Sequence, residues 1–400
     1  MSLVKLGEIC DFFNGGAWTQ SEFTETGYPV LKVSNCKNSG FEVDDVSFIP
    51  PEIAQKSENN KLYIGDVIIA TVGSHPNLVE SAAGRSYIVT QKVQGFYLNQ
   101  NAVCLRSKDC DVLDQGYLGY LAASAPFKHY IQSRGKGAAN QMRIAISAIK
   151  EYEFILPEIK IQRKIGATLA AYDDLIENNQ KQIKLLEEAA QRLYKEWFVD
   201  LRFPGHETTP ITDGIPEGWG AKTLTDIASV IMGQSPKSEF YNQDGKGLPF
   251  HQGVGSYGTR FVIDNTYSTS YTRIAEAGSI LFSVRAPVGR LNMTKNKVVI
   301  GRGLAAINHR AGKQSYLFYL LKERFFKDDI IGNGAIFASI SKDELLGQKF
   351  LIPNEELVTR FDTVVSAMDK KIADLADQIT LLIEARDRLL PKLMNGEIEV

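Results

Sequence analysis

The 400-residue sequence lacks the marks of several large protein classes. Its four cysteines (Cys10, Cys36, Cys104 and Cys110) show no CxxC spacing, and its five histidines are scattered. This pattern argues against a zinc site and favours reduced thiols. No apolar run approaches the roughly 18–20 residues that a membrane helix needs, and the amino terminus has no basic region followed by an apolar stretch. We therefore expect a cytoplasmic protein with no membrane partner.

Catalytic motifs are missing as well. The chain has no GxxxxGK[ST] phosphate loop, no serine nucleophile elbow and no HExxH helix. GRGLAA at 301–306 resembles a dinucleotide-binding turn only superficially, because Arg302 would project where a pyrophosphate should be bound. EIK at 158–160 matches the end of a nuclease metal site, but a three-letter match is weak. The sequence predicts a binding protein that is not an enzyme and holds no metal or cofactor.

The charge is segregated along the chain. The net charge is only −2, which by itself disfavours a nucleic-acid partner. However, residues 273–327 carry eleven Lys and Arg against two acids, a balance of +9, and residues 128–164 carry eight against three, a balance of +5. Local charge, and not total charge, sets an electrostatic footprint. The alternative is that these stretches are merely solvated surface.

A long-range repeat is the strongest feature present. QIKLLEEAAQRLYKEWF (182–198) and QITLLIEARDRLLPKLM (378–394) are identical at eight of seventeen positions, at an offset of 196 residues. The alignment extends over some 45 residues without a gap. Upstream of each copy, LGEICDFFNGGAWTQSEF (6–23) is similar to LTDIASVIMGQSPKSEF (224–240). The chain is therefore two divergent copies of one unit, a globular part followed by a long helix.

Each long helix carries a coiled-coil seam, because apolar residues recur at alternating steps of four and three. The seam positions of the two copies are Tyr172, Ile176, Asn179, Ile183, Leu186, Ala190 and Leu193, and Met368, Ile372, Leu375, Ile379, Leu382, Arg386 and Leu389. We expect the two helices to pack on each other as a rod roughly 55 Å long. Pro391 should end or kink the second helix and leave Leu393 outside the seam. Two ordinary core helices in separate domains remain the alternative.

The predicted fold class is α+β, because β-branched and aromatic runs alternate with Gly, Asn and Ser turns in each globular part. Two globular domains are separated by two long helices that form a coiled coil. The predicted parts are a first globular domain at 1–155, a central helix at 156–202, a polar Pro/Gly-rich linker at 203–219, a second globular domain at 220–352, and a carboxyl-terminal helix at 353–400.

This layout resembles the specificity subunit of type I restriction–modification systems, and the resemblance covers nearly the whole chain. The segments that carry it are FSVRAPVG (282–289), PEGW (216–219), residues 155–203 and RLLPKLMNGEIE (388–399). The first domain departs from the pattern, because it starts almost at residue 4 with no PxGW lead-in. Its IATVGSHPNLV is also only a loose counterpart of FSVRAPVG.

The resemblance implies a function and a set of partners. Each globular part would be a target recognition domain that reads one half of a split sequence in double-stranded DNA, and the two domains would be pseudo-symmetric. The two long helices, antiparallel to each other in a coiled coil, would set the gap between the halves. Two methyltransferase subunits and motor–nuclease restriction subunits would be the protein partners. S-adenosylmethionine and ATP would be bound by those partners. Because the two domains differ in sequence, the target should be asymmetric.

Base reading requires polar side chains at groove edges, and Arg, Asn and Gln pair bidentately with guanine or adenine. Candidates in the first domain are Asn14, Trp18, Thr19, Gln20, Lys32, Asn35, His75, Asn77, Arg134, Lys136, Asn140, Gln141 and Arg143. Candidates in the second domain are Gln234, Ser235, Lys237, His251, Gln252, Tyr257, Arg260, Arg285, Arg290 and Arg302. Trp18 has an alternative place in the core, and Arg285 an alternative role in the structure of its own domain.

Two other functions compete with this interpretation. The first is a coiled-coil scaffold whose globular parts bind no DNA. A scaffold would not need opposed basic and acidic segments, and its two domains could be identical copies. The second is a stand-alone nuclease that uses Glu158 and Lys160, which metal-dependent cutting by the purified chain would reveal.

Overall fold

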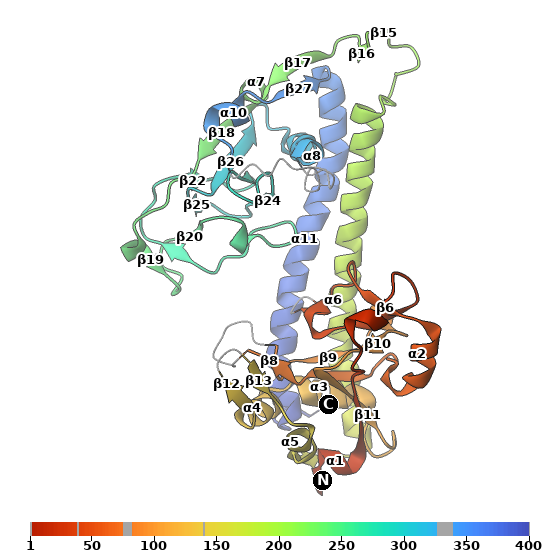
Figure 1. Cartoon of the computed structure of the whole chain (residues 1–400). Coiled ribbons are helices and arrows are strands. Elements are labelled where there is room, and N and C mark those ends of the chain that lie inside the picture. The colour runs from red at the N-terminus through yellow and green to blue at the C-terminus, as the bar shows by residue number, and fades with distance from the viewer. Residues whose placement is uncertain (1, 38–39, 75–81, 139–140, 326–338, 400) are drawn as a thin grey trace. The chain divides into compact units, whose positions relative to one another are not determined.

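The computed structural model describes residues 2–37, 40–74, 82–138, 141–325 and 339–399. The chain forms two compact units (Figure 1). Unit 1 consists of residues 1–178 and 378–400, and unit 2 consists of residues 179–377. Each unit therefore contains one globular domain and about half of each long helix. None of the helices in the described part of the chain is long and apolar enough to cross a membrane.

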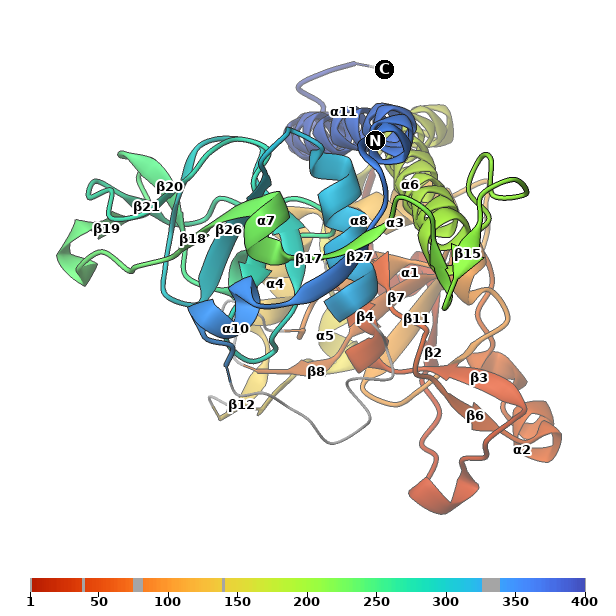
Figure 2. The ribbon, with the colours of Figure 1, turned by 90° about the horizontal axis from the view of Figure 1, so that it is seen from above.

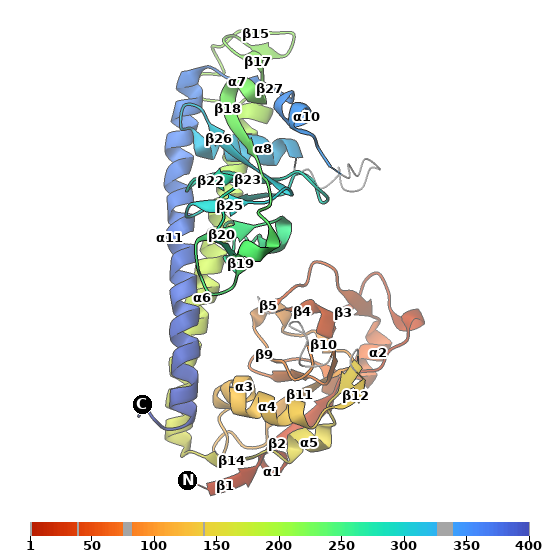
Figure 3. The same ribbon diagram turned by 90° about the vertical axis from the view of Figure 1, so that its left-hand side faces the viewer.

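The long helices are α6 (Ile159–Tyr194), which a π-helical turn extends to Val199, and α11 (Glu355–Met394). In unit 1, Ile165 and Leu169 near the start of α6 share a core with Leu393 near the end of α11. In unit 2, Tyr194 at the end of α6 packs with Phe361 near the start of α11. The helices are therefore antiparallel (Figure 3).

The fourteen seam positions are all buried or half-buried. The two polar seam residues are also shielded from solvent: Asn179 is buried, and Arg386 is half-buried. The second helix does not end at Pro391, because α11 continues through it to Met394. Leu393 is 2% exposed in the core of unit 1. One backbone hydrogen bond is lost at the proline, and burial of the leucine offsets that cost.

The globular part of unit 1 is built around two main sheets. The larger has the order β2 (Cys10–Asn14), β11 (Ala102–Ser107), β7 (Val67–Ala70) and β9 (Ser86–Ile88). The smaller has the order β10 (Tyr97–Leu98), β3 (Tyr28–Leu31) and β6 (Ser47–Ile49). Side chains of a strand alternate between its faces, so Val67 and Ile69 pack on α3 (Gln115–Ala123), and Ile68 packs on the smaller sheet. This explains the unbroken apolar run in β7.

The globular part of unit 2 repeats this plan (Figure 2). Its first sheet has the order β18 (Ala228–Met232), β26 (Leu304–His309), β23 (Ile280–Ser283) and β24 (Leu291–Met293). Its second sheet has the order β19 (Tyr241–Asn242), β21 (Tyr267–Ser268), β20 (Leu248–His251), β25 (Val298–Ile300) and β22 (Ile274–Ala275). Helix α8 (Gln314–Phe325) lies between the first sheet and the long helices, with which it shares a core. It corresponds to α3 of unit 1.

A strand pair joins each domain to its long helix. In unit 1, β1 (Ser2–Lys5) pairs with β14 (Glu153–Leu156), directly before α6. In unit 2, β17 (Gly220–Thr223) pairs with β27 (Lys349–Ile352), directly before α11. The segment predicted as a linker at 203–219 is anchored at both ends, because Phe203 and Trp219 are buried together against Leu357. Aromatic packing therefore holds this polar segment on unit 2.

Candidate nucleic-acid interface

Three strands of the second domain end at one edge, where backbone hydrogen bonds tie the following turns together. Gly233 donates to the Leu304 carbonyl (2.8 Å), and Gly301 donates to the His251 carbonyl (2.8 Å). A Cβ at Gly233 would lie 2.1 Å from the Gly301 carbonyl oxygen, so the approach requires glycine. The turns carry four of the predicted residues, which we call turn cluster 2: Gln234, Ser235, Gln252 and Arg302.

Ser235 organises turn cluster 2. Its hydroxyl donates to Oε1 of Gln252 (2.9 Å) and accepts the backbone N–H of Arg302 (3.3 Å). Gln234, Gln252 and Arg302 are exposed, and Ser235 is half-buried between them. A hydrogen-bonded turn thus presents an amide and a guanidinium side by side to solvent. Both groups suit base edges or phosphates.

The first domain has the same backbone arrangement. Gly15 donates to the Ala102 carbonyl (3.0 Å), and Asn99 donates to the Leu31 carbonyl (2.9 Å). These bonds match Gly233 to Leu304 and Gly301 to His251. The four-stranded sheets of the two domains have the same strand order, and the parallel pair of β3 and β10 corresponds to that of β20 and β25. The side chains at this edge, which we call turn cluster 1, are Asn14, Lys32 and Gln100.

Gln100 was missed by the sequence reading. It is exposed between β10 and β11, at the position that Arg302 occupies between β25 and β26. YLNQNAV (97–103) and VIGRGLA (299–305) share no letter that would reveal this. Aligning them requires the strand registers, in which Val103 lies opposite Asn14 and Ala305 lies opposite Met232.

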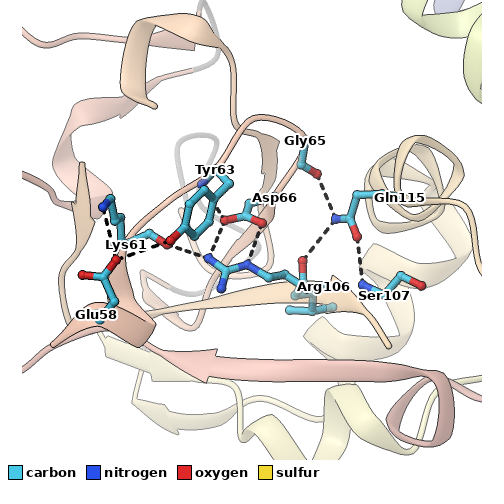
Figure 4. A network of polar contacts seen from close by, with 9 residues as sticks. Glu58, Lys61, Tyr63, Gly65, Asp66, Arg106, Ser107 and Gln115 are labelled. Atoms are coloured by element: carbon cyan, nitrogen blue, oxygen red, sulfur yellow. Dashed lines mark hydrogen bonds and ion pairs between the residues drawn. The ribbon is translucent and has the colours of Figure 1, made fainter. Parts of the chain in front are cut away.

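A polar network supports β11, the strand that follows Gln100 (Figure 4). Arg106 donates from Nε to Oδ1 of Asp66 (2.8 Å) and from Nη2 to Oδ2 (2.7 Å), and it lies over the Tyr63 ring. Gln115 joins the backbones of Ser107 and Gly65. Asp66 is 4% exposed, so the two-pronged ion pair is shielded from water. The network fixes β11 against the start of β7 and α3.

A second basic element of the first domain is the hairpin of β12 (Lys136–Ala138) and β13 (Gln141–Arg143). Lys136 lies directly opposite Arg143, and both are exposed. Like charges placed directly opposite destabilise a strand pair, so their presence favours an anionic ligand. Nearby, the exposed Arg134 guanidinium stacks on the Tyr130 ring at 3.6 Å.

Four of the predicted contacts are corrected by burial. Trp18 is 8% exposed in a small core with Val30, Ile49, Ala54 and Tyr97. His251 is fully buried, and its Nε2 lies 3.0 Å from Oδ1 of Asp264. The hydroxyl of Tyr257 is buried, and burial raises its pKa. These groups cannot reach DNA without unfolding the domain around them.

Arg260, the fourth, lies 4% exposed against the long helices. It donates to Asp369 (2.7 Å), lies 4.0 Å from Glu187, and stacks 3.5 Å above the Phe318 ring. Burial raises the pKa of Glu187, and Arg260 acts against that rise. The arginine thus fastens the second domain to α6 and α11 and is not a DNA contact.

Three first-domain candidates have local structural roles. The Thr19 hydroxyl and backbone N–H both donate to Glu22 (2.7 Å each) at the start of a 3-10 turn. Asn35 accepts the backbone N–H of Lys32 (3.0 Å). The Lys32 ammonium donates to the Ser47 hydroxyl (2.7 Å) and is half-buried. Only a rearranged Lys32 would reach a phosphate.

The remaining candidates lie apart from the turn clusters or outside the described part. Gln20, Lys237 and Arg285 are exposed, and Arg290 is half-buried. His75, Asn77 and Asn140 lie outside the described residues, as does the side chain of Gln141. Within the described ranges, no group of three His, Cys, Asp or Glu residues could hold a metal ion. Glu158 and Lys160, the residues of the nuclease alternative, are both exposed at the start of α6.

Comparison with protein families shows to which family the chain and its two domains belong. The family model for the type I restriction modification DNA specificity domain matches residues 1–188 and again residues 216–391. The chain belongs to this family. Its two globular parts are DNA specificity domains, each matched together with most of the long helix that follows it, and the fold is a pair of pseudo-symmetric domains with an antiparallel coiled coil.

Curated relatives extend this similarity over the whole chain. A putative type I restriction enzyme MjaX specificity subunit of Methanocaldococcus jannaschii is 27% identical over 99% of this chain and 93% of its own length. The HindI specificity subunit of Haemophilus influenzae is 21% identical over 96% of each chain. Among solved structures, the type I S subunit from M. genitalium covers 98% of this chain and 95% of its own, with 18% identity and a TM-score of 0.60, which shows a shared fold.

Proposed function

We propose that this chain reads an asymmetric bipartite sequence in double-stranded DNA and directs methyltransferase and restriction subunits to it. The observation that carries the proposal is the pair of turn clusters. Two DNA specificity domains of one plan present different side chains from the same strand-end turns. Gln100 in the first domain stands where Arg302 stands in the second, whereas Lys32, the counterpart of Gln252, is bound to Ser47. Different donors and acceptors at matched places select different bases.

The basic hairpin and stretches would supply the phosphate contacts that position the protein. Lys136, Arg143 and Arg134 are exposed on the first domain, and Lys237 and Arg285 are exposed on the second. Phosphate contacts carry affinity and salt dependence but no sequence information. The scaffold alternative has no use for these exposed charges, and the family match gives it no support.

The antiparallel helices would act as the spacer between the half-sites. We expect that one additional heptad in both α6 and α11 keeps the 4–3 seam in register and lengthens each helix by about 10 Å. The gap in the DNA target should grow by about three base pairs at 3.4 Å each, while both half-sites keep their letters. Inserting three residues into α6 alone shifts the seam and is the matched control. Changed half-site letters in the heptad variant would contradict the spacer role.

The outer face of the helices supports docking of one protein partner in two copies. The eight identical positions of the repeat include three seam residues, and the other five are Gln182, Leu185, Glu188, Ala189 and Arg192. Positions facing the second domain differ between copies: Glu187, which lies near Arg260, corresponds to Ile383. Residues two apart on a helix point about 200° apart, so Leu185 faces away from that domain.

Exposure agrees with this division of the helix faces. Leu185 and its counterpart Leu381 are each 64% exposed, although leucine is seldom left in water. A face that is alike in both repeats, carries an exposed leucine and is adjacent to the seam fits two copies of the same helical partner surface, as two methyltransferase subunits would provide. We expect Leu185→Glu and Leu381→Glu each to remove one of the two subunits, and the double variant to remove both. Mass measurement of the assembled complex tests this, with Lys370→Glu as an exposed control.

The decisive experiment is a base-resolution map of methylated adenines in the source organism with and without the gene. Loss of methylation at a single split motif would establish the chain as the specificity subunit for that motif. Reintroducing the gene should restore the same motif. A map that is unchanged by deletion would contradict the proposed function and favour the scaffold. Assembly requires that the companion methyltransferase be expressed, which should be measured in the same cells.

A further inference from the structure

The turn between β10 and β11 of the first domain and the turn between β25 and β26 of the second are built on one backbone template. In addition to the bonds described above, Gly16 donates to Leu98 (2.8 Å) as Gln234 donates to Ile300 (3.0 Å). On the other side of the turn, the carbonyl of Asn101 accepts a backbone N–H (2.8 Å), as does that of Gly303 (2.9 Å). Backbone hydrogen bonds therefore hold the turn on both sides of the single residue at its tip.

That tip residue is Gln100 in the first domain and Arg302 in the second. We propose that these two are the matched base-reading residues of the protein, and that Gln100 selects adenine in one half-site and Arg302 selects guanine in the other. The inference rests on the proposed function, and it names the residues that make the two half-sites different.

The environment of the two side chains suits this role. Both are exposed, and among the described residues neither side chain has a hydrogen bond or an ion pair. The backbone N–H of Gln100 is bound to the Gly16 carbonyl (2.8 Å), and that of Arg302 to the Ser235 hydroxyl (3.3 Å). A residue that reads a base needs a fixed Cα position and a polar side-chain end that has no other partner. Ordering a whole loop during binding would cost conformational entropy.

Other arginines of the second domain do not meet these conditions. Arg260 is committed to Asp369, and Arg290 is half-buried. Arg285 is exposed on the turn after β23, where its neighbour Val284 donates to the Gly303 carbonyl (2.9 Å), so it lies beside the tied turns and not at their tip. Arg302 also stands next to Gln252, whose amide oxygen is already held by Ser235. Its neighbour is thus oriented, which leaves the guanidinium as the adjustable donor.

The hydrogen-bonding groups of each side chain predict which base it selects. A guanidinium donates two parallel hydrogen bonds to O6 and N7 of guanine, and a glutamine amide donates to N7 and accepts from N6 of adenine. A well-placed pair of this kind discriminates against a wrong base by roughly five- to 150-fold. Exchanging the two side chains on one template should therefore exchange the two letters.

The test uses the complete chain assembled with its methyltransferase subunits. Arg302→Gln and Gln100→Arg are made separately, and the methylated motif and the sequences bound from a randomised DNA pool are determined. We expect Arg302→Gln to replace one guanine by adenine in one half-site only, and Gln100→Arg to replace one adenine by guanine in the other half only. Lys222→Gln, an exposed change in β17 of the same domain, should leave both half-sites unaltered.

The outcomes separate the inference from the proposed function. If the wild-type complex selects no split motif, the proposed function fails. If it selects one and Arg302→Gln leaves every letter intact, the inference fails. Uniformly weaker binding with a salt slope reduced by about one would make Arg302 a phosphate contact and would also overturn it. Arg302→Lys keeps the charge and loses the two-pronged geometry, so relaxed selection at that guanine is expected even if Arg302→Gln assembles poorly.

Discussion

Asp173 and Asp369 stand at the same position of the two repeats, and each accepts a hydrogen bond from a tyrosine of its own recognition domain. Tyr120 donates to Asp173 (2.6 Å), and Tyr319 donates to Asp369 (3.3 Å). The balancing arginines come from different places. Arg386 of α11 pairs with Asp173 (2.5 Å), whereas the second domain supplies its own Arg260 to Asp369 (2.7 Å). The repeat itself explains the difference, because the counterpart of Arg386 is alanine.

Removing the two arginines should have unequal effects on stability. Arg260→Leu leaves the half-buried carboxylates of Asp369 and Glu187 without the buried guanidinium, which typically costs about 3–5 kcal/mol. Arg386→Leu removes a pair whose side chains are 28% and 36% exposed, so we expect about 1 kcal/mol or less. Urea unfolding of both variants measures the difference. Equal losses, or a larger loss for Arg386→Leu, would contradict the assignment of Arg260 as the buried fastening. Arg302→Leu serves as the exposed control.

The close approach of turns in the second domain should not tolerate a side chain at Gly233. Gly233→Ala places a Cβ 2.1 Å from the Gly301 carbonyl oxygen, so the turns must separate. We expect weaker selection of one half-site, with the other half-site unchanged, in a binding selection from randomised DNA. Gly255→Ala is the matched control, because nothing lies within 4 Å of its added Cβ. Full selectivity in Gly233→Ala would show that turn cluster 2 is not at the DNA.

The β12–β13 hairpin should contribute affinity without sequence preference. Lys136→Gln and Arg143→Gln each remove one charge from an exposed like-charge pair. Each should reduce the slope of log affinity against log salt by about one and weaken binding uniformly across sequences. Titrations at several salt concentrations with target and non-target duplexes give both quantities. A loss confined to the target duplex would instead assign these residues to base reading.

His309 should make the second domain less stable in mild acid. Burial, and secondarily Lys313, lower its pKa below the usual 6.5, and its Nδ1 accepts the backbone N–H of Ala311 (3.1 Å). The unfolded chain therefore binds a proton more readily than the folded chain, so stability is lost as the pH falls through the unfolded pKa. His309→Gln should show a smaller drop in urea midpoint between pH 7.5 and pH 5.5 than the wild type. An unchanged drop would assign the pH dependence to other groups.

The architecture could be predicted from the sequence because the spacing of a repeat persists after its individual residues have changed. The offset of 196 residues and the alternating steps of four and three were sufficient to predict two similar domains, each followed by a long helix with an apolar seam. Segments such as FSVRAPVG and RLLPKLMNGEIE were sufficient for the family resemblance, which the family model confirms. Such features depend on local residue order alone.

Individual contacts depended on the tertiary structure. His251 and Arg260 have the residue types of DNA contacts, but strand ends and the long helices bury them. Gln100 became visible only when two strand registers were superimposed, and Leu393 only when the core of unit 1 was assembled. Burial and turn position arise from segments that are distant in sequence. The sequence by itself therefore determined the repeat, the helices and the family, and only the fold decided which polar side chains remain in water to meet DNA.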